Sequence, residues 1–262
     1  MKPPTHLKAA EADRLAGILF DLDDTFLDGG ALTEIAYVAL HQLSRAGLRL
    51  VAVTGRPAGW GEVMARQWPV DAVVTENGAL AFYRDRSGLG RWERVDEPTR
   101  RARRVRIASA FAELRQRFPE VRMSDDSHAR TSDIALDIGE SQRVPADVVA
   151  AIESVARTLG MRTFVSSVHL HLTLDPFDKA TGTLAFLADR FGEDPTLARL
   201  RYAYIGDSAN DASCFFAFAT TFGVANVRAA LPRLTLGPRY VAEAAKGAGF
   251  AEIARCILAV RS

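Results

Sequence analysis

The sequence predicts an α/β protein in which a doubly wound parallel sheet carries an inserted, smaller α+β cap domain. Short apolar segments of strand length alternate with amphipathic segments of helix length at both ends of the chain, which is typical of an open parallel sheet with helices on both faces. Between residues 84 and 175 the order becomes helix, strand, strand, helix, strand, strand. We therefore expect a core of residues 1–83 and 176–262 and a cap of residues 84–175.

The composition sets bounds on the class of protein. With 262 residues and 48% hydrophobic content, the chain can bury the core of one large domain or two unequal ones. The formal net charge of +1 provides no global field to recruit nucleic acid or membranes. Cys214 and Cys256 lie in apolar stretches without metal-ligand spacing, which favours a reducing cytoplasm. Residues 1–14 lack the apolar stretch of a signal peptide, and we expect a loose lead there.

The first half of the core begins with a buried strand. Residues 15–20 are apolar and end at Asp21, and residues 32–46 show helical spacing up to Gly47. A Gly follows Asn77, and Asn-Gly favours positive backbone angles and a hairpin. Further elements are expected as strands at 48–53 and 71–75, a helix at 58–67, and a return strand at 79–83.

The expected cap follows a charged connector at residues 84–91. An Arg-rich amphipathic helix is expected at 98–118 and a second helix at 145–159. Four strands are expected in two pairs, at 121–124 with 133–138 and at 162–166 with 169–174. Residues 100–106 contain five arginines, but nearby acidic residues and the lack of interleaved aromatic residues favour a solvated helix face over a nucleic-acid site.

The alternating pattern then resumes. Helices are expected at 180–191, 210–216 and 246–260, and strands at 202–205 and 220–224. The most apolar region, residues 212–227, is interrupted by polar residues and does not predict a membrane span.

Polar side chains follow three of the expected parallel strands. Asp21, Thr54 and Asp207 each fall at the end of such a strand. The carboxyl ends of parallel strands meet at one edge of the sheet, where open α/β proteins bind their ligands. The sequence therefore predicts a site there.

The chemistry of this site is set by its charges. Asp21, Asp23 and Asp24 repel one another, and a divalent cation such as Mg²⁺ compensates carboxylates best. Asp211 lies one helical turn beyond Asp207 and can hold a ligand or a bound water in place. Lys179 can offset the negative charge and bring a cation to phosphate oxygens. This combination indicates phosphoryl chemistry.

These residues resemble a known family. Asp21-Leu-Asp-Asp-Thr, Thr54-Gly-Arg, Lys179 and Gly206-Asp-Ser-Ala-Asn-Asp resemble the four ordered motifs of haloacid dehalogenase-like (HAD-like) phosphatases, over the whole chain. The insertion between the second and third motifs looks like the cap of the Cof-type group (subfamily IIB). That group includes sucrose-phosphate, trehalose-phosphate and mannosyl-3-phosphoglycerate phosphatases. The resemblance implies a Rossmann-like core and a Mg²⁺-dependent phosphatase of a small phosphorylated metabolite, foremost a sugar phosphate.

The resemblance also implies a role for each motif residue. Asp21 would attack phosphorus and form an aspartyl-phosphate, and Asp23 would carry the proton. Thr54 and Lys179 would stabilise the phosphoryl oxygens. The implied metal-binding residues are Asp21, Asp23 (by its carbonyl), Asp207 and Asp211. The implied phosphate- and substrate-binding residues are Thr54, Gly55, Arg56, Asn77, Lys179 and Asn210, with Asp125 and Arg130 from the cap.

Some alternatives stay open at this point. Asp24 stands where these phosphatases often have Gly, which can alter the turn or the metal affinity. Asp23 favours phosphate chemistry over dehalogenation, but a phosphosugar mutase of the same family and a noncatalytic phosphometabolite-binding protein remain alternatives. No nucleic acid or membrane partner is expected, and the protein is expected to be a cytoplasmic monomer or homodimer.

Several other residues each have two possible interpretations. The polar loop 125–130 is either a substrate contact or a solvated turn. His169 and His171 share one face of a strand, and a substrate-facing or solvent-facing surface is favoured over a zinc site because no third ligand is apparent. Trp60 either packs in a helix or stacks on a sugar. Arg56 and Glu76 either fix the crevice and its closure or form a structural ion pair.

Overall fold

The centre of the molecule is one sheet of eight strands in the order β11-β10-β9-β1-β2-β3-β4-β5. The structure is a computed structural model that describes residues 1–261. Neighbouring strands from β11 to β3 are parallel, whereas β3–β4 and β4–β5 are antiparallel. The strands of this sheet are β1 (Gly17–Phe20), β2 (Arg49–Val53), β3 (Ala72–Thr75), β4 (Leu80–Asp85), β5 (Gly88–Glu93), β9 (Tyr202–Gly206), β10 (Thr220–Gly223) and β11 (Tyr240–Val241).

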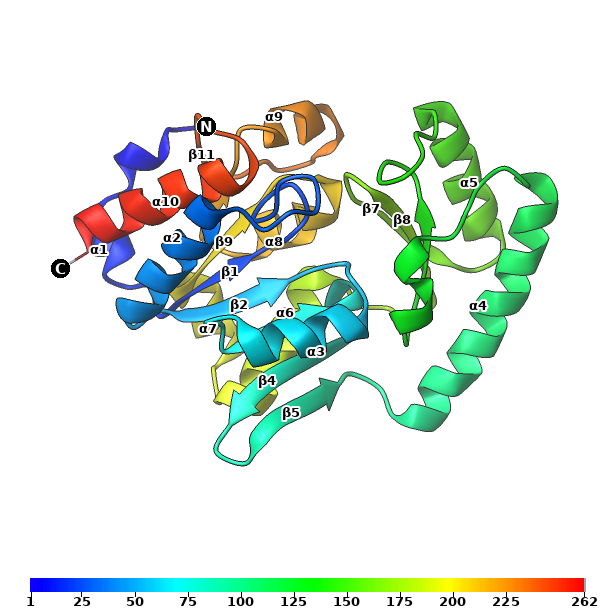
Figure 1. Cartoon of the computed structure of the whole chain (residues 1–262), viewed down its shortest axis with the longest axis horizontal. Helices are drawn as coiled ribbons and strands as arrows, with labels where there is room; N and C mark the ends of the chain where they lie inside the picture. Colours follow the sequence, from blue (N-terminus) through cyan, green and yellow to red (C-terminus); the bar gives the residue numbers. More distant parts are fainter. Residues whose placement is uncertain (262) are drawn as a thin grey trace.

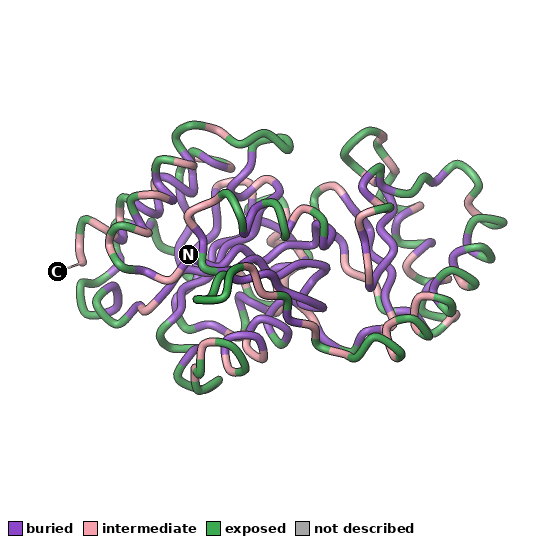
Figure 2. Tube along the Cα trace, turned by 60° about the horizontal axis from the view of Figure 1, so that its bottom comes forward, coloured by how far each residue is buried: buried purple, intermediate pink, exposed green. Residues whose placement is uncertain are grey.

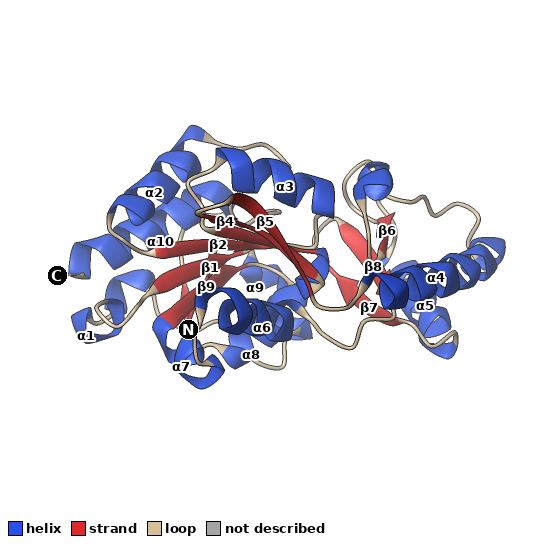
Figure 3. Ribbon diagram, turned by 90° about the horizontal axis from the view of Figure 1, so that it is seen from below, coloured by secondary structure: helices blue, strands red, loops and turns tan. Residues whose placement is uncertain are grey.

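Helices cover both faces of this sheet (Figure 3). In β1, Ile18 and Phe20 pack into one hydrophobic cluster and Leu19 into another, because successive strand residues point to opposite faces. One face carries α2 (Glu34–Arg45), α3 (Ala58–Gln67) and α10 (Lys246–Val260), and the other carries α6 (Lys179–Phe191), α7 (Pro195–Arg201) and α8 (Ala212–Ala217). Burial on both faces explains why the core strands read as continuous apolar runs (Figure 2).

The cap is a separate layer beside the core (Figure 1). Its antiparallel sheet has the order β6-β8-β7. The elements of the cap are α4 (Glu97–Arg117), β6 (Ile134–Asp137), α5 (Ala146–Thr158), β7 (Arg162–Val165) and β8 (His169–Thr173). Leu170 and Leu172 of β8 pack with Ile107 of α4 and Ile152 of α5. The alternate residues of β8 therefore lie on the opposite face of the sheet, toward the core.

Two crossovers join the core to the cap, and they lie side by side. The first follows β5, and the second connects β8 to α6. The guanidinium of Arg94 in the first lies 6.0 Å from the ring centroid of Phe177 in the second. Arg162 donates to the carbonyls of Asp175 and Phe177 at 3.1 and 3.2 Å, and Arg103 of α4 pairs with the Asp175 carboxylate. The second crossover is thus fixed to the cap up to Phe177.

Short helices complete the chain. They are α1 (Ala9–Ala12), α9 (Val227–Ala230) and the 3-10 helices η1 (Pro4–His6), η2 (Glu76–Gly78), η3 (Asp125–Ala129), η4 (Ala209–Asp211) and η5 (Leu231–Arg233). No helix within residues 1–261 is long and apolar enough to cross a membrane.

The predicted fold class is confirmed, with three corrections. Residues 84–91 are not a connector, because β4 and β5 form a hairpin that extends the core sheet to Glu93; the cap therefore starts later than residue 84. Residues 121–124 do not form a strand and make only an isolated bridge, Met123 with Leu136. Residues 1–14 are not loose, since Lys2 bridges to Tyr240 and Leu7 and Ala12 are buried. Helix α7 was not expected.

Candidate active site

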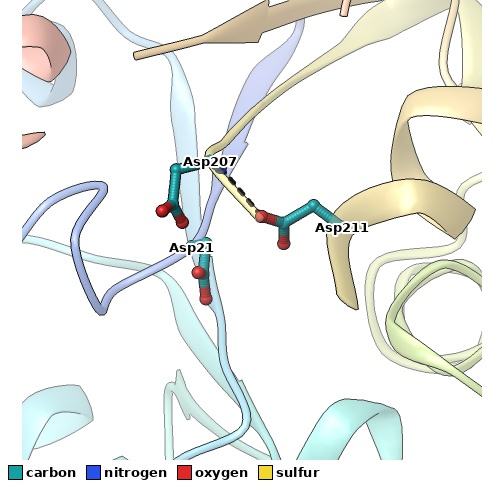
Figure 4. A group of neighbouring side chains, drawn as sticks. All are labelled: Asp21, Asp207 and Asp211. Atoms are coloured by element: carbon teal, nitrogen blue, oxygen red, sulfur yellow. Dashed lines mark hydrogen bonds between the residues drawn. The ribbon is translucent and has the colours of Figure 1, made fainter. Parts of the chain in front are cut away.

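Three buried carboxylates meet at the carboxyl edge of the central sheet (Figure 4). Asp21 follows β1, and its N–H donates to the Ile205 carbonyl of β9 at 2.9 Å. Asp207 follows β9, and Asp211 ends η4. One carboxylate oxygen from each of the three lies within 4.8 Å of the others. The parallel pairing of β1 with β9 thus joins residues that are far apart in sequence.

Lys179 lies between two of these carboxylates. It is the first residue of α6, a helix that starts with a capping box between Asp178 and Thr181. Its Nζ lies 2.8 Å from Asp21 Oδ1 and 2.7 Å from Asp211 Oδ1. The ammonium therefore compensates part of the negative charge in a site where Lys179 is only 1% exposed.

Asp211 has all its acceptor capacity in use. Its Oδ1 accepts from Lys179 Nζ and from the Tyr204 hydroxyl at 2.5 Å. Its Oδ2 accepts from the N–H groups of Asp207 and Ser208 at 2.9 and 3.0 Å. A Cβ on Gly206 would lie 2.5 Å from this Oδ2, so only glycine permits the approach. This arrangement favours Asp211 as a residue that positions Lys179 and the Asp207 loop.

Asp207 is held by two side chains that the sequence analysis did not single out. Thr25 Oγ1 donates to Oδ1 at 3.1 Å, and Asn226 Nδ2 donates to Oδ2 at 2.7 Å. Asn226 Nδ2 also donates to the Asp24 carbonyl at 3.0 Å. The sequence does contain a signal for Asn226, because this residue lies in the loop that follows β10, just as Asp21 follows β1. The same strand-end rule would have found it.

Burial and mutual repulsion perturb these carboxyl groups. Desolvation, opposed by Lys179 and reinforced by Asp211 and Asp23, raises the pKa of Asp21 to about 7. Desolvation together with Asp211 and Asp21 raises the pKa of Asp207 well above its ordinary value. Burial opposes the charge of Lys179, but attraction to Asp21 and Asp211 outweighs it and raises the pKa of the ammonium. The cluster therefore holds more negative charge than Lys179 alone compensates.

The donor set fits a hard divalent cation. Asp21 and Asp207 offer carboxylate oxygens in a buried, electron-rich site, and Mg²⁺ prefers one or two carboxylates together with waters and phosphate oxygens. Asp211 is saturated by four donors, so Asp21 and Asp207 are the better ligands.

The loop after β2 brings the second motif to this edge. The Thr54 N–H donates to the Val74 carbonyl at 2.9 Å, and the Asn77 N–H donates to the Thr54 carbonyl at 3.1 Å. The Glu76 N–H donates to the Arg56 carbonyl at 3.1 Å. These bonds join the loops after β2 and β3, so Thr54, Gly55, Arg56 and Asn77 lie together as one buried group.

Comparison with known proteins agrees with this geometry. The family described as haloacid dehalogenase-like hydrolase matches residues 18–89, which include Asp21, Asp23 and Thr54. This part of the chain is similar to haloacid dehalogenase-like hydrolases. No curated protein matches the sequence.

Solved structures share the fold of this chain. A Thermoplasma acidophilum protein, 0175, is 17% identical with a TM-score of 0.71, over 93% of this chain and 98% of its own. Sucrose-phosphatase from Synechocystis is 18% identical with a TM-score of 0.63, over 93% and 98%. A phosphatase of this superfamily from Bacteroides thetaiotaomicron is 17% identical with a TM-score of 0.63, over 95% and 97%. All three matches extend over the cap as well as the core.

At the candidate active site, Arg56 links Asp23 to the cap. Its Nη2 lies 2.8 Å from Asp23 Oδ1, and its Nε lies 2.9 Å from Asp23 Oδ2. The same guanidinium reaches Glu140 Oε1 at 2.7 Å and Asp126 Oδ2 at 3.4 Å. It also lies 4.5 Å from the ring centroid of Trp60, so Trp60 packs on Arg56. Arg56 therefore does take part in ion pairs, with carboxylates of both the core and the cap.

Glu76 clamps a cap loop onto the core of the haloacid dehalogenase-like fold. Its Oε1 accepts from the N–H groups of Ala58 and Thr131 at 3.0 and 2.9 Å. Its Oε2 accepts from the N–H and Oγ of Ser132 at 2.6 and 2.7 Å, and from the Asp133 N–H at 3.3 Å. One core carboxylate thereby binds three consecutive cap residues, although burial raises its pKa.

The other predicted substrate-binding residues have different surroundings. Arg130 is buried and donates to Asp126, to Asp133 and to the Gly55 carbonyl, so its guanidinium fastens the cap to the core. Asp125 is exposed, and its backbone carbonyl lies 3.2 Å from His128 Nδ1 of the same loop. Asn210 accepts from Ser208 Oγ at 2.7 Å, while Lys179 is oriented by Asp21 and Asp211.

Asp24 occupies its unusual position without joining the cluster. Its φ is +58°, in the left-handed region that favours Gly and that Asp and Asn tolerate best among other residues. Its carboxylate lies 3.2 Å from Lys246 Nζ. The side chain is therefore directed to an ion pair outside the three-carboxylate group.

Proposed function

We propose that this protein is a Mg²⁺-dependent phosphatase of a small phosphorylated metabolite, foremost a sugar phosphate, and that it acts through an aspartyl-phosphate on Asp21. The observation that carries the proposal is the contact of Lys179 Nζ with Asp21 Oδ1 at 2.8 Å, next to Asp207 and at the meeting point of β1 and β9. A nucleophilic carboxylate beside a buried ammonium suits attack on a phosphate, whose negative charge the ammonium balances.

The proposed steps use residues of this chain. A carboxylate oxygen of Asp21 attacks phosphorus, and the bond from phosphorus to the ester oxygen breaks as Asp23 gives that oxygen a proton. Water then attacks the aspartyl-phosphate, Asp23 takes a proton from this water, and phosphate and the Asp21 carboxylate are released. Thr54 and Lys179 bind the phosphoryl oxygens. Asp21, Asp207 and the Asp23 carbonyl would hold Mg²⁺, which when bound neutralises charge on the phosphoryl oxygens.

The substrate class is supported by the similar proteins. The Synechocystis sucrose-phosphatase was solved in complex with sucrose and phosphate, and another structure of the same fold is a trehalose-6-phosphate phosphatase related protein, 16% identical. The free Cys214 and Cys256 support a cytoplasmic location as part of the proposal.

The first experiment measures phosphate release with Mg²⁺ from hexose, disaccharide, phosphoglycerate-linked and nucleotide monophosphates. We expect wild-type turnover that Asp21→Asn reduces by roughly 10³-fold or more, because the nucleophile is lost. Asp28→Asn is the matched control, since Asp28 is an exposed carboxylate on the loop after β1, and circular dichroism checks the folding of each variant.

The outcomes separate the alternatives. Turnover that needs Mg²⁺ and fails only in Asp21→Asn supports the phosphatase. Phosphate that is transferred to a second sugar instead of water indicates a mutase. Binding of a phosphometabolite by the wild type without any turnover supports a noncatalytic binding protein and contradicts the proposal.

A further inference from the structure

The core-facing side of the cap sheet brings His171 against Gly55. His171 lies on β8 between Leu170 and Leu172, which pack into the cap interior. A Cβ on Gly55 would lie 2.7 Å from His171 Nε2 and 3.3 Å from Asn77 Oδ1. His171 from the cap and Asn77 from the core therefore meet over the residue that follows Thr54.

The hydrogen bonds of His171 define what its Nε2 can do. Its Nδ1 lies 2.9 Å from Asp133 Oδ2, and Asp133 also pairs with Arg130 at 3.0 Å. Burial opposes ionisation of Asp133, but Arg130 and His171 outweigh it and lower its pKa to about 2, so it is a carboxylate that accepts. Burial lowers the pKa of His171 to about 4. The ring is therefore neutral near pH 7, with Nδ1 donating and Nε2 carrying a lone pair.

Three buried polar atoms around Gly55 have no hydrogen-bond partner among residues 1–261. They are His171 Nε2 and both amide atoms of Asn77, Oδ1 and Nδ2. His171 and Asn77 are 1% and 3% exposed. Leaving such a group unpaired costs about 1–3 kcal/mol. The neighbouring His169 differs, because its Nε2 lies 2.8 Å from Glu140 Oε2. Of the two histidine Nε2 atoms on this face of β8, the one that lies against Gly55 is thus the one left without a partner.

We propose that His171 Nε2 and the Asn77 amide together recognise a hydroxyl group of the leaving group, next to the phosphoryl site. This inference rests on the proposed phosphatase function and names the feature that its substrates share. A hydroxyl is both donor and acceptor, so it donates to Nε2 and accepts from Asn77 Nδ2. The Asn77 backbone already bonds to Thr54, which places the pair beside the residue proposed to bind the phosphoryl oxygens.

The same atoms disfavour a second anion at this position. An anionic group offers acceptors only, and it would face the Nε2 lone pair with the Asp133 carboxylate behind the ring. Phosphate esters of sugars and other polyols are therefore the expected substrates, ahead of bisphosphates and phosphorylated acids. Since Asn77 belongs to η2 and His171 to β8, the pair is complete only while the cap is closed on the core.

The test compares esters that differ in their hydroxyl groups. The two pairs are glycerol 3-phosphate with n-propyl phosphate, and glucose 6-phosphate with cyclohexylmethyl phosphate. For the wild type we expect kcat/KM to favour the hydroxyl-bearing ester of at least one pair by roughly 5-fold or more, as one neutral hydrogen bond provides. His171→Phe should remove that preference. Its kcat/KM for the ester without hydroxyl groups should stay within about 2-fold of the wild-type value. His171→Gln, which restores an acceptor, should recover part of it.

The ratio of kcat/KM for the two esters of a pair also defines the control and the results that would contradict the proposal. His128→Phe makes the same exchange at an exposed cap position and should keep the wild-type preference. An equal loss on both esters in His171→Phe would indicate a purely structural role and overturn the proposal, as would an unchanged preference.

A binding measurement separates this inference from the phosphatase proposal. Calorimetry on Asp21→Asn and on Asp21→Asn with His171→Phe reports affinity for the same esters without turnover. Tighter binding of the hydroxyl-bearing ester that depends on His171 supports the hydroxyl site, even if the wild type releases no phosphate. Absence of phosphate release would then contradict only the phosphatase proposal. Binding without discrimination, or no binding of any hydroxyl-bearing ester, overturns the hydroxyl site.

Discussion

At the scale of single residues, neighbouring carboxylates in this site have different tasks because their hydrogen bonds differ. Asp211 is saturated by Lys179, Tyr204 and two backbone N–H groups. Asp207 accepts one side-chain donor on each oxygen and keeps lone pairs free for a cation. The family resemblance assigned both residues to the metal site. The distinction depends on Tyr204 and Asn226, whose contacts arise only in the folded chain.

The burial of His171 leads to a prediction about how the stability of the fold depends on pH. Its pKa is about 4 when folded and 6.5 ordinarily, so as pH falls the unfolded chain takes up the proton first. The stability linked to His171 is therefore complete above about pH 6.5 and is lost as pH falls toward about 4. Between about pH 7 and about pH 4.5 the free energy of unfolding of the wild type should fall by about 2–3 kcal/mol more than that of His171→Phe.

Denaturant unfolding at the two pH values measures this difference. Comparing variants is necessary because the raised pKa of Asp21 acts in the opposite direction and is common to both proteins. The exposed His128→Phe serves as the control. Parallel pH profiles for the wild type and His171→Phe would show that His171 is not held neutral by burial.

At the scale of elements, the Glu76 clamp joins η2 of the core to the loop before β6. Glu76 has a φ of +48°, a left-handed conformation that costs of order 1–3 kcal/mol for such a residue. The five cap hydrogen bonds that its carboxylate accepts offset that strain. They also fix Asp133, which orients His171.

Glu76→Gln should therefore loosen the closed cap. The amide nitrogen of Gln would replace one of the two carboxylate oxygens and face N–H donors, so the bonds from Thr131 N–H or those from the Ser132 and Asp133 N–H groups are lost. We expect faster hydrogen exchange of those amides and a fall in kcat/KM of roughly 10-fold, since closure completes the site. Glu62→Gln, which alters an exposed pair with Arg66, should change neither. Unchanged exchange at residues 131–133 in Glu76→Gln would refute the clamp.

The elements differed in how far the sequence predicts them. Strands such as β1 and β9 are apolar throughout and end in polar motifs, so they were predicted closely. β5 was missed because Gly88, Gly90 and charged residues conceal its pairing with β4, which depends on the hairpin. The capped start of α7 at Asp194-Pro195 was a usable helix signal. The clamps at Arg56 and Glu76 could not be assigned, because their partners lie in another domain.

At the scale of the whole molecule, the negative charge of the carboxylate cluster that Lys179 does not compensate links thermal stability to Mg²⁺ binding. Near pH 8 a saturating Mg²⁺ concentration, about 10 times its Kd, should raise the Tm by about 2–4 °C through preferential binding to the folded chain. The gain should be smaller near pH 6, since the pKa of Asp21 is about 7 and protons then compete with the cation.

Thermal unfolding with Mg²⁺ and with a chelator measures the effect. Asp207→Asn should lose the gain, while Asp28→Asn, an exposed change nearby, should keep it. An equal rise in Tm for Asp207→Asn would place the cation elsewhere.

The two adjacent crossovers constrain how the cap can move. Arg94 and Phe177 lie against each other, so the two connections between cap and core are close together, and we expect the cap to rotate about an axis that passes through them. Lys179 lies on the core side of this axis and His171 on the cap side. Such a rotation separates His171 from Gly55 and leaves the Lys179–Asp21 pair intact. Opening and closing of the cap would therefore leave the proposed phosphoryl site of the core assembled throughout each cycle.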